Sequence, residues 1–250
     1  MSIALLELAA ARLGLLLDDV AFLGGASLVL WVDDTGAPDP RVTMDVDVIV
    51  LADSRIDYYR LSEQLRQQGF SEDVRDGVIC RCHGELILDV MPTDETILGF
   101  TNRWYPAALV AAEIMTLPSG KQIRAVTPPY LLATKIEAFR GRGRDDYLAS
   151  VDFEDLVRLV DGRERLVVEV EAAPSAPLRW TSDSKRVSVP DSFPTLQVRR
   201  DATSYSSACA RCLASAESHA ENRGLAPRTD SRRVTSERGY WARASKPIRR

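Results

Sequence analysis

The stretch that decides the fold reads Arg41-Val42-Thr43-Met44-Asp45-Val46-Asp47-Val48-Ile49-Val50. Its alternation of acidic and apolar residues predicts a β-strand over residues 45–51, because successive side chains of a strand point to opposite faces. Asp45 and Asp47 would then project together, roughly 7 Å apart, while Val46 and Val48 point into a core. Two carboxylates on one stiff strand suit a hard divalent cation, which prefers oxygen ligands.

A third carboxylate lies in a second apolar run, Leu86-Ile87-Leu88-Asp89-Val90. An acid on a buried strand costs free energy unless it is paired or bound to a metal. A purely solvated or capping role therefore explains Asp47 and Asp89 poorly. Three acids on two strands indicate a site for metal-dependent phosphoryl transfer.

A glycine turn precedes these strands, in the sequence Phe22-Leu23-Gly24-Gly25-Ala26-Ser27. Paired glycines between a strand and a helix let the backbone approach a ligand closely. The N-terminus of the following helix offers free N–H groups to a phosphate, and Ser27 could add a hydroxyl. Any tight turn can use two glycines, so the turn gains its meaning from the acids that follow it.

The remaining pattern predicts an α/β (α+β) fold, in which a mixed sheet with flanking helices is followed by a helical region. Helices are expected over residues 3–17, 26–32, 56–68, 128–140 and 152–171. Strands are expected over residues 20–23, 45–51, 77–82, 85–91, 112–117 and 121–126, with a hairpin at His83-Gly84. We place a catalytic α/β domain at residues 1–126 and a helical C-terminal region, which could be incomplete, at residues 127–172.

The composition changes abruptly after residue 172. Residues 1–172 carry 17 basic and 29 acidic side chains, whereas residues 173–250 carry 15 basic and 7 acidic ones. Leu, Ile, Val and Phe supply only 10 of the last 78 residues, too few to offset the entropy of ordering them. We expect a disordered tail at 173–250. It would be either a basic arm that binds nucleic acid or, as we favour, an out-of-frame product of a GC-rich gene.

Composition excludes several other classes. No apolar run approaches the roughly 20 residues that a membrane span needs, and the first residues lack the basic start of a secretory signal. We therefore expect a cytoplasmic protein without membrane contact. A single CxxC pair, Cys209 and Cys212, is weak evidence for zinc, which takes four ligands. His83 and His219 are expected on exposed loops, which gives little support to a mechanism based on histidine.

The glycine turn, the Asp-x-Asp strand and the third aspartate together resemble the nucleotidyltransferases of the polymerase-beta-like superfamily. The pattern is most similar to the AbiEii-type group, the toxins of type IV toxin–antitoxin systems. The run Leu132-Ala133-Thr134-Lys135-Ile136-Glu137-Ala138-Phe139 resembles that group's lysine-bearing helix, and Asp152-Phe153-Glu154-Asp155-Leu156 resembles its later acidic element. The Arg41–Asp47 run also fits, and the resemblance covers about residues 20–172.

The resemblance implies a role for each matching position. Mg²⁺ or Mn²⁺ would be held by Asp45, Asp47 and Asp89, which with Lys135 form the expected catalytic set. The nucleotide would be bound by Gly24, Gly25, Ser27, Arg41, Thr43 and Lys135. Asp152 and Asp155 would contact the residues that bind the metal and the nucleotide, without touching these ligands themselves.

The residues alone leave plainer alternatives for the second half. Lys135 could be an exposed helix lysine, and Asp152 and Asp155 could be acids that favour a helix N-terminus. A basic patch of Arg140, Arg142 and Arg144 could steer a nucleotide or RNA, or be a solvated loop.

The activity that the resemblance implies is transfer of a nucleoside monophosphate from an NTP to an RNA or protein acceptor, such as a tRNA. A cognate antitoxin would be the expected protein partner. Three alternatives stay open at this point: modification of a small molecule such as an antibiotic, a non-catalytic member that binds a nucleotide or partner, and a truncated pseudogene product.

Overall fold

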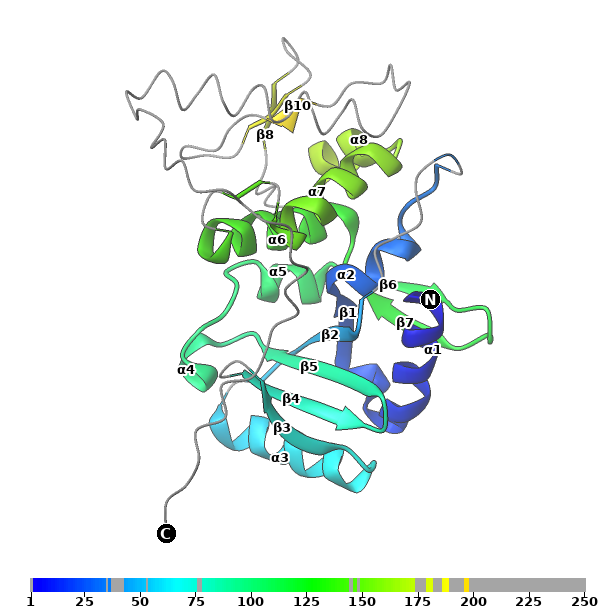
Figure 1. The fold of residues 1–250 in the computed structure, drawn as a ribbon, viewed down its shortest axis with the longest axis vertical. Helices are drawn as coiled ribbons and strands as arrows, with labels where there is room; N and C mark the ends of the chain where they lie inside the picture. The colour runs from blue at the N-terminus through cyan, green and yellow to red at the C-terminus, as the bar shows by residue number, and fades with distance from the viewer. Residues whose placement is uncertain are drawn as a thin grey trace, which may run out of the picture.

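A computed structural model of the chain describes residues 2–34, 36, 43–52, 54–75, 78–143, 146–147 and 149–173, together with three short strands beyond them. The fold is mixed α/β, as predicted: a seven-stranded mixed sheet carries helices on both faces (Figure 1). None of the helices in the described ranges is long and apolar enough to cross a bilayer.

The seven strands run in the spatial order β3-β4-β5-β2-β1-β7-β6. Their bounds are β1 Val20–Leu23, β2 Asp45–Val50, β3 Ser71–Arg75, β4 Val78–His83, β5 Leu86–Pro92, β6 Glu113–Thr116 and β7 Gln122–Ala125. β2 lies at the centre, antiparallel to β1 and parallel to β5. The hairpin predicted between the strands around His83-Gly84 is confirmed, because β4 and β5 pair antiparallel there.

Two apolar cores pack against opposite faces of the sheet. One face is covered by α1 (Ser2–Leu13) and α3 (Arg55–Gln67), and the other by α5 (Tyr105–Val110), α6 (Pro128–Arg142) and α7 (Val151–Gly162). In Figure 1 the green helices α6 and α7 lie above the sheet, while α1 and α3 lie below or beside it. The alternation of β2 explains this division: Val46 and Val48 are buried in the first core, and Ile49 is buried in the second.

Several helix boundaries differ from the sequence-based expectation. The helix expected at residues 3–17 ends at Leu13, because Gly14 has φ +54° and the chain continues as a 3-10 helix (Gly14–Asp19). The helix expected at 26–32 is a single turn, α2 (Gly24–Ser27), followed by a 3-10 turn (Leu28–Leu30). The glycine at 141 does not end α6, which runs on to Arg142.

The final helical region is two helices, α7 and α8 (Leu166–Ala172), where the sequence predicted one over residues 152–171. Arg163 lies at the break between them. Its guanidinium pairs with Glu169 at 2.6 Å and with Asp33 at 3.1 Å, and it also donates to the carbonyl of Trp31 at 3.1 Å. These contacts tie the break to the loop that follows α2.

The sequence pattern missed β3 and two short helices, α4 (Glu95–Leu98) and α5. β3 is an edge strand with exposed Ser71, Glu72 and Asp73, so it has no apolar alternation to detect. No strand was expected after residue 172, yet β8 (Arg179–Thr181), β9 (Arg186–Ser188) and β10 (Leu196–Gln197) pair in a small antiparallel sheet. Apart from these strands, residues 174–250, with Cys209, Cys212 and His219, lie outside the described residues.

Candidate active site

The three predicted acids lie side by side at the centre of the sheet. In the parallel register of β2 and β5, Asp47 is the partner of Asp89, and Asp45 is the partner of Ile87. Asp45 and Asp47 share the face opposite Val46 and Val48, both of which are fully buried. The prediction that one strand presents two carboxylates to the same side is therefore confirmed.

A cleft of about 720 Å³ opens in front of these acids. Its floor contains Asp45, Asp47 and Asp89, together with the backbone of Gly24. Its other walls come from α6 and from the segment before α5; they include Phe100, Asn102, Tyr105, Lys135 and Arg142. The cleft thus joins the sheet to the helical half of the chain, which the sequence pattern assigned to separate regions.

Position 24 requires glycine, because any side chain there would clash with Asp47. Its φ is +75°, a left-handed conformation that favours glycine. A Cβ at this position would fall 1.8 Å from the Asp47 Oδ2 atom. The glycine turn therefore lets the end of β1 pass directly beside the Asp47 carboxylate at the floor of the cleft.

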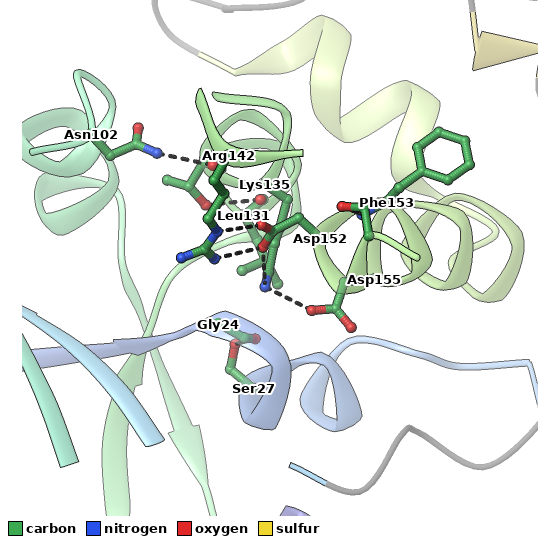
Figure 2. Close-up of polar contacts among 11 residues, drawn as sticks. Gly24, Ser27, Asn102, Leu131, Lys135, Arg142, Asp152, Phe153 and Asp155 are labelled. Atoms are coloured by element: carbon green, nitrogen blue, oxygen red, sulfur yellow. Dashed lines mark hydrogen bonds and ion pairs between the residues drawn. The ribbon is translucent and has the colours of Figure 1, made fainter. Parts of the chain in front are cut away.

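Ser27 has a different role from the one predicted. Its side chain is fully buried, and its hydroxyl donates to the Gly24 carbonyl at 2.9 Å (Figure 2). Gly25 is buried as well. Ser27 therefore stabilises the turn from inside, and its side chain has no exposed surface for a bound nucleotide.

Two further nucleotide-binding predictions fall at the start of β2. The Thr43 side chain is buried, and its hydroxyl has no hydrogen-bond partner among the described atoms. Arg41 and Arg144 lie outside the described residues. The structure therefore gives no direct role to these three positions.

Asp47 is the most perturbed acid in the cleft. Its pKa is raised to about 7: burial is the largest cause, the like charges of Asp45 and Asp89 act in the same direction, and the Lys135 ammonium opposes them. The ionised form of Asp47 is thus held at a cost in the free protein. A cation bound between these carboxylates would relieve that cost.

Lys135 is not an exposed helix lysine. Its side chain is 11% exposed, and its ammonium lies 2.7 Å from Asp155 and 3.2 Å from Asp152. Burial alone would lower the pKa of Lys135, but the carboxylates of Asp155 and Asp152 outweigh burial and raise it. Figure 2 shows the ammonium extending from α6 toward the turn at Gly24. Lys135 therefore stays charged where the helical wall faces the acids.

Arg142 completes this cluster at the mouth of the cleft. Its Nε donates to Asp152 Oδ2 at 2.7 Å and its Nη2 donates to Asp152 Oδ1 at 2.9 Å, a bidentate pair. Burial would raise the pKa of Asp152, but its bonds to Arg142 and Lys135 lower it. Of the proposed basic patch, Arg142 thus has a defined partner, and its side chain is still 71% exposed.

Packing between α6 and α7 fixes the geometry of this charged cluster. The rings of Phe139, Tyr147 and Phe153 lie within 5.0–5.4 Å of one another between centroids. The Ser150 hydroxyl accepts from the Phe153 amide at 3.3 Å and caps α7 at its first turn. Asp152 is thereby placed in the first turn of α7, where its charge is also favoured by the helix dipole.

Sequence reasoning missed three residues of the cleft: Phe100, Asn102 and Tyr105. All three belong to a segment with no recognisable periodicity. Burial raises the pKa of the Tyr105 hydroxyl, and the Asp47 carboxylate raises it further, which places this phenol close to the acids. The sequence does mark the two ends of this segment, by Gly99 before it and Pro106 after it, since glycine and proline mark the ends of short elements.

The donor set at the floor of the cleft fits Mg²⁺ or Mn²⁺ in its chemistry. All its donors are carboxylate oxygens, and burial, with a smaller contribution from the neighbouring carboxylates, raises the pKa of Asp47. Within the part of the chain that the structure describes, no three side chains of His, Cys, Asp or Glu are arranged to hold a metal ion. Mg²⁺ is commonly held by one or two carboxylates together with substrate phosphates and water, so a complete protein cage is not required.

His83 does not lie on an exposed loop as predicted. It ends β4, it is half-buried, and its ring packs edge-on against Phe70 at 5.4 Å between centroids. It belongs to the packing of the sheet and is not among the residues that line the cleft.

Comparison with known proteins gives only distant likenesses, all among solved structures. No protein-family model matches the chain, and no curated protein matches it. Among solved structures, the chain is similar to an antigenic nucleotidyltransferase-like protein from Paracoccidioides brasiliensis, with 19% identity and a TM-score of 0.46. The match covers 64% of this chain and 75% of that one. A likeness this distant carries no inference about activity.

Proposed function

We propose that the protein is a nucleotidyltransferase that moves a nucleoside monophosphate from an NTP to an acceptor hydroxyl. One observation carries the proposal: the carboxylates of Asp45, Asp47 and Asp89 face a single cleft that Lys135 closes from the opposite side. Acids on two neighbouring strands, with a buried cation across from them, suit the binding of metal and triphosphate together.

The charge of the cleft supports the same reading. Its described lining carries four acids, Asp45, Asp47, Asp89 and Glu137, against two bases, Lys135 and Arg142. Both bases are already engaged by carboxylates of α7. A triphosphate would therefore meet a surplus of negative charge, and we infer that it enters with divalent cations.

Each residue would contribute a separate task. The Gly24 turn keeps the end of β1 close to Asp47, so that the floor of the cleft is rigid. Lys135 would attract the phosphates as a point charge, while Asp155 and Asp152 hold its ammonium in place. Most of the rate would come from positioning and from neutralisation of charge, as in other phosphoryl transfers.

Carboxylates among Asp45, Asp47 and Asp89, together with the phosphates of the NTP, would hold Mg²⁺ or Mn²⁺, which when bound would neutralise the triphosphate and make the acceptor hydroxyl a better nucleophile. The acceptor oxygen forms a bond to the α-phosphorus, the bond from that phosphorus to the bridging oxygen breaks, and pyrophosphate leaves. A carboxylate of the floor, Asp89 in our proposal, would take the proton from the acceptor hydroxyl.

The resemblance of the glycine turn, the Asp-x-Asp strand and the Lys135 helix to AbiEii-type toxins extends the proposal to a biological setting. We propose an RNA or protein acceptor and a cognate antitoxin in a type IV toxin–antitoxin pair. The face of α6 that carries Lys135 and Arg142 would meet that acceptor at the open side of the cleft.

The test is a labelling reaction. Purified full-length protein is incubated with Mg²⁺ and each of the four α-³²P-labelled NTPs, in the presence of total cellular RNA and protein from a bacterial host. We expect label to enter one acceptor class, with pyrophosphate released in equal amount. Label from γ-³²P-NTP instead would show kinase chemistry and contradict nucleotidyl transfer.

The variant Asp45→Asn tests whether the cleft carries out this reaction, and Asp18→Asn is its matched control. Asp18 is an exposed acid of the first 3-10 helix and lies outside the cleft. Activity should vanish in the first variant and persist in the second. Equal activity in both would show that the label comes from a contaminant or from another site.

A further inference from the structure

One wall of the cleft is formed by the segment between α4 and α5. It carries Phe100, whose side chain lines the cleft and is 44% exposed. The hydroxyl of Thr101 donates to the Pro92 carbonyl at the end of β5, at 3.2 Å. The Asn102 amide donates to the Thr134 carbonyl of α6 at 2.9 Å, as Figure 2 shows. The segment is therefore fixed both to the sheet and to the helical half.

Three polar side chains near Phe100, those of Asn102, Thr134 and Glu137, already have partners within the protein. Asn102 Oδ1 accepts from the amide of Trp104 at 3.1 Å, and the Thr134 hydroxyl donates to the Leu131 carbonyl at 2.9 Å. Glu137 pairs with Arg103 at 3.0 Å. At Phe100 the wall therefore offers a ligand an exposed aromatic side chain, whose neighbours Asn102, Thr134 and Glu137 are hydrogen-bonded or paired within the protein.

We propose that Phe100 is the stacking platform for the base of the bound NTP, and that the site selects bases by ring area rather than by reading their edges. This inference rests on the proposed function and names the part of the substrate that the wall contacts. Stacking on an aromatic side chain tolerates every base, because each base has a π face. Purines, with the larger face, then bind more tightly than pyrimidines.

The position of Phe100 relative to the acids fits this assignment. Met91 lines the cleft on the same face of β5 as Asp89, two residues farther along, which is roughly 7 Å. Pro92 follows Met91 and anchors Thr101, so Phe100 lies beyond that end of the strand. A base stacked on Phe100 leaves its triphosphate extending back toward Asp89 and the Lys135 ammonium.

The experiment measures the binding of Mg²⁺ complexes of ATP, GTP, CTP, UTP and inorganic tripolyphosphate to the full chain by titration calorimetry. The parent protein should bind the two purine nucleotides several-fold more tightly than the two pyrimidine nucleotides. Phe100→Leu, which keeps the apolar bulk, should weaken all four nucleotides, on the order of tenfold for purines, and should narrow the purine preference. Tripolyphosphate should bind both proteins equally.

Two further variants frame that result. Phe100→Trp enlarges the ring and should restore or strengthen nucleotide binding. Tyr59→Leu removes an aromatic ring that is 68% exposed on α3, outside the cleft, and should change nothing.

Three outcomes would overturn the inference. One is unchanged nucleotide affinity in Phe100→Leu. If acceptor binding is weakened instead, the Phe100 ring contacts the acceptor and not the base. Another is an equal loss for tripolyphosphate, which would show a general distortion of the cleft. The third is strict selection of one base that survives Phe100→Leu. If the parent binds neither nucleotide nor tripolyphosphate, the proposed function fails as well, whereas nucleotide binding that ignores Phe100 leaves that function standing.

Discussion

Two sides of the cleft carry their charges in opposite arrangements: the floor on β2 and β5, called here the sheet wall, and the side formed by α6 and α7, called the helical wall. The sheet wall gathers Asp45, Asp47 and Asp89, and burial together with mutual repulsion raises the pKa of Asp47 to about 7. The helical wall balances its charges internally, because Lys135 and Arg142 pair with Asp152 and Asp155 at 2.7–3.2 Å. In the free protein the sheet wall carries acids that burial and repulsion destabilise in their charged form, whereas each charge named on the helical wall has an oppositely charged partner.

The helical wall therefore has a structural role in addition to holding Lys135 in place for the phosphates, whereas the acids of the sheet wall have a binding role alone. A wall whose charges are satisfied contributes to stability, and its disruption should unfold or loosen the helical half. A wall of crowded like charges lowers stability in the free protein, so its acids are better explained by a ligand that neutralises them. Substitutions on the two walls should accordingly have different effects.

The largest effect is expected on the sheet wall, in activity. Asp45→Asn should lower nucleotidyl transfer roughly 10³-fold, because a metal-binding carboxylate supplies several kcal/mol of stabilisation to the transition state. The fold should persist, with an unchanged circular dichroism spectrum. Retention of more than a tenth of the parent rate would remove Asp45 from the catalytic set.

On the helical wall, Asp152→Ala should lower the free energy of unfolding by about 3 kcal/mol, because it leaves a buried ammonium with one fewer carboxylate. Urea denaturation measures the loss. The paired change Lys135→Met with Asp152→Leu should not recover the loss, because it also takes the ammonium away from the buried Asp155 carboxylate. A loss below about 0.5 kcal/mol would contradict a structural role for this network.

The sheet wall could be predicted from the sequence, and the helical wall only in part. The alternation around Asp45 and Asp47 determines which side chains share a face, so the common orientation of these two acids follows from the sequence pattern alone. Lys135 and Asp152 lie 17 residues apart in sequence, and their pairing depends on how α7 packs against α6, which periodicity does not encode.

Phe100 was missed for a related reason. Its segment has no repeating pattern, and its position comes from two side-chain hydrogen bonds, from Thr101 to Pro92 and from Asn102 to Thr134. Ser27 was assigned to the phosphates because its hydroxyl follows the glycine turn and because the family resemblance implies that role. Its burial depends on α2 lasting one turn and entering the core.

The contact between Gly24 and Asp47 should affect both stability and nucleotide binding. Gly24→Ala should cost about 2 kcal/mol in backbone strain and should also displace Asp47, because the new Cβ would fall 1.8 Å from its Oδ2. Gly120→Ala is the matched control: φ there is +83° and a Cβ would meet nothing within 4 Å. Both variants should lose stability through backbone strain, Gly24→Ala more because of the clash with Asp47, and only Gly24→Ala should lose nucleotide binding. Equal nucleotide binding in both would show that Asp47 adapts.

A smaller effect is expected from pH. The folded pKa of Asp47, about 7, lies above its ordinary value of 3.8, so the folded state holds the proton more tightly than the unfolded state does. The resulting stabilisation is complete at pH below about 4 and is lost as the pH rises to about 7. Asp47→Asn removes this dependence.

The measurement is the melting temperature in metal-free buffer at pH 5 and pH 8. Asp47→Asn should gain on the parent protein at pH 8, and the gain should shrink at pH 5. Addition of Mg²⁺ at pH 8 should raise the melting temperature of the parent more than that of the variant. A variant that is less stable than the parent at pH 8 would show that the Asp47 carboxylate stabilises the fold.

The central claim is that the sheet wall binds a triphosphate only together with a divalent cation. Titration calorimetry of the full chain with ATP, at pH 8, in EDTA and then in excess Mg²⁺, tests it directly. We predict no measurable binding in EDTA and binding in Mg²⁺, abolished in Asp45→Asn and retained in Asp18→Asn. Equal ATP binding with and without Mg²⁺ would contradict the claim, as would ATP binding in Mg²⁺ that survives Asp45→Asn unchanged.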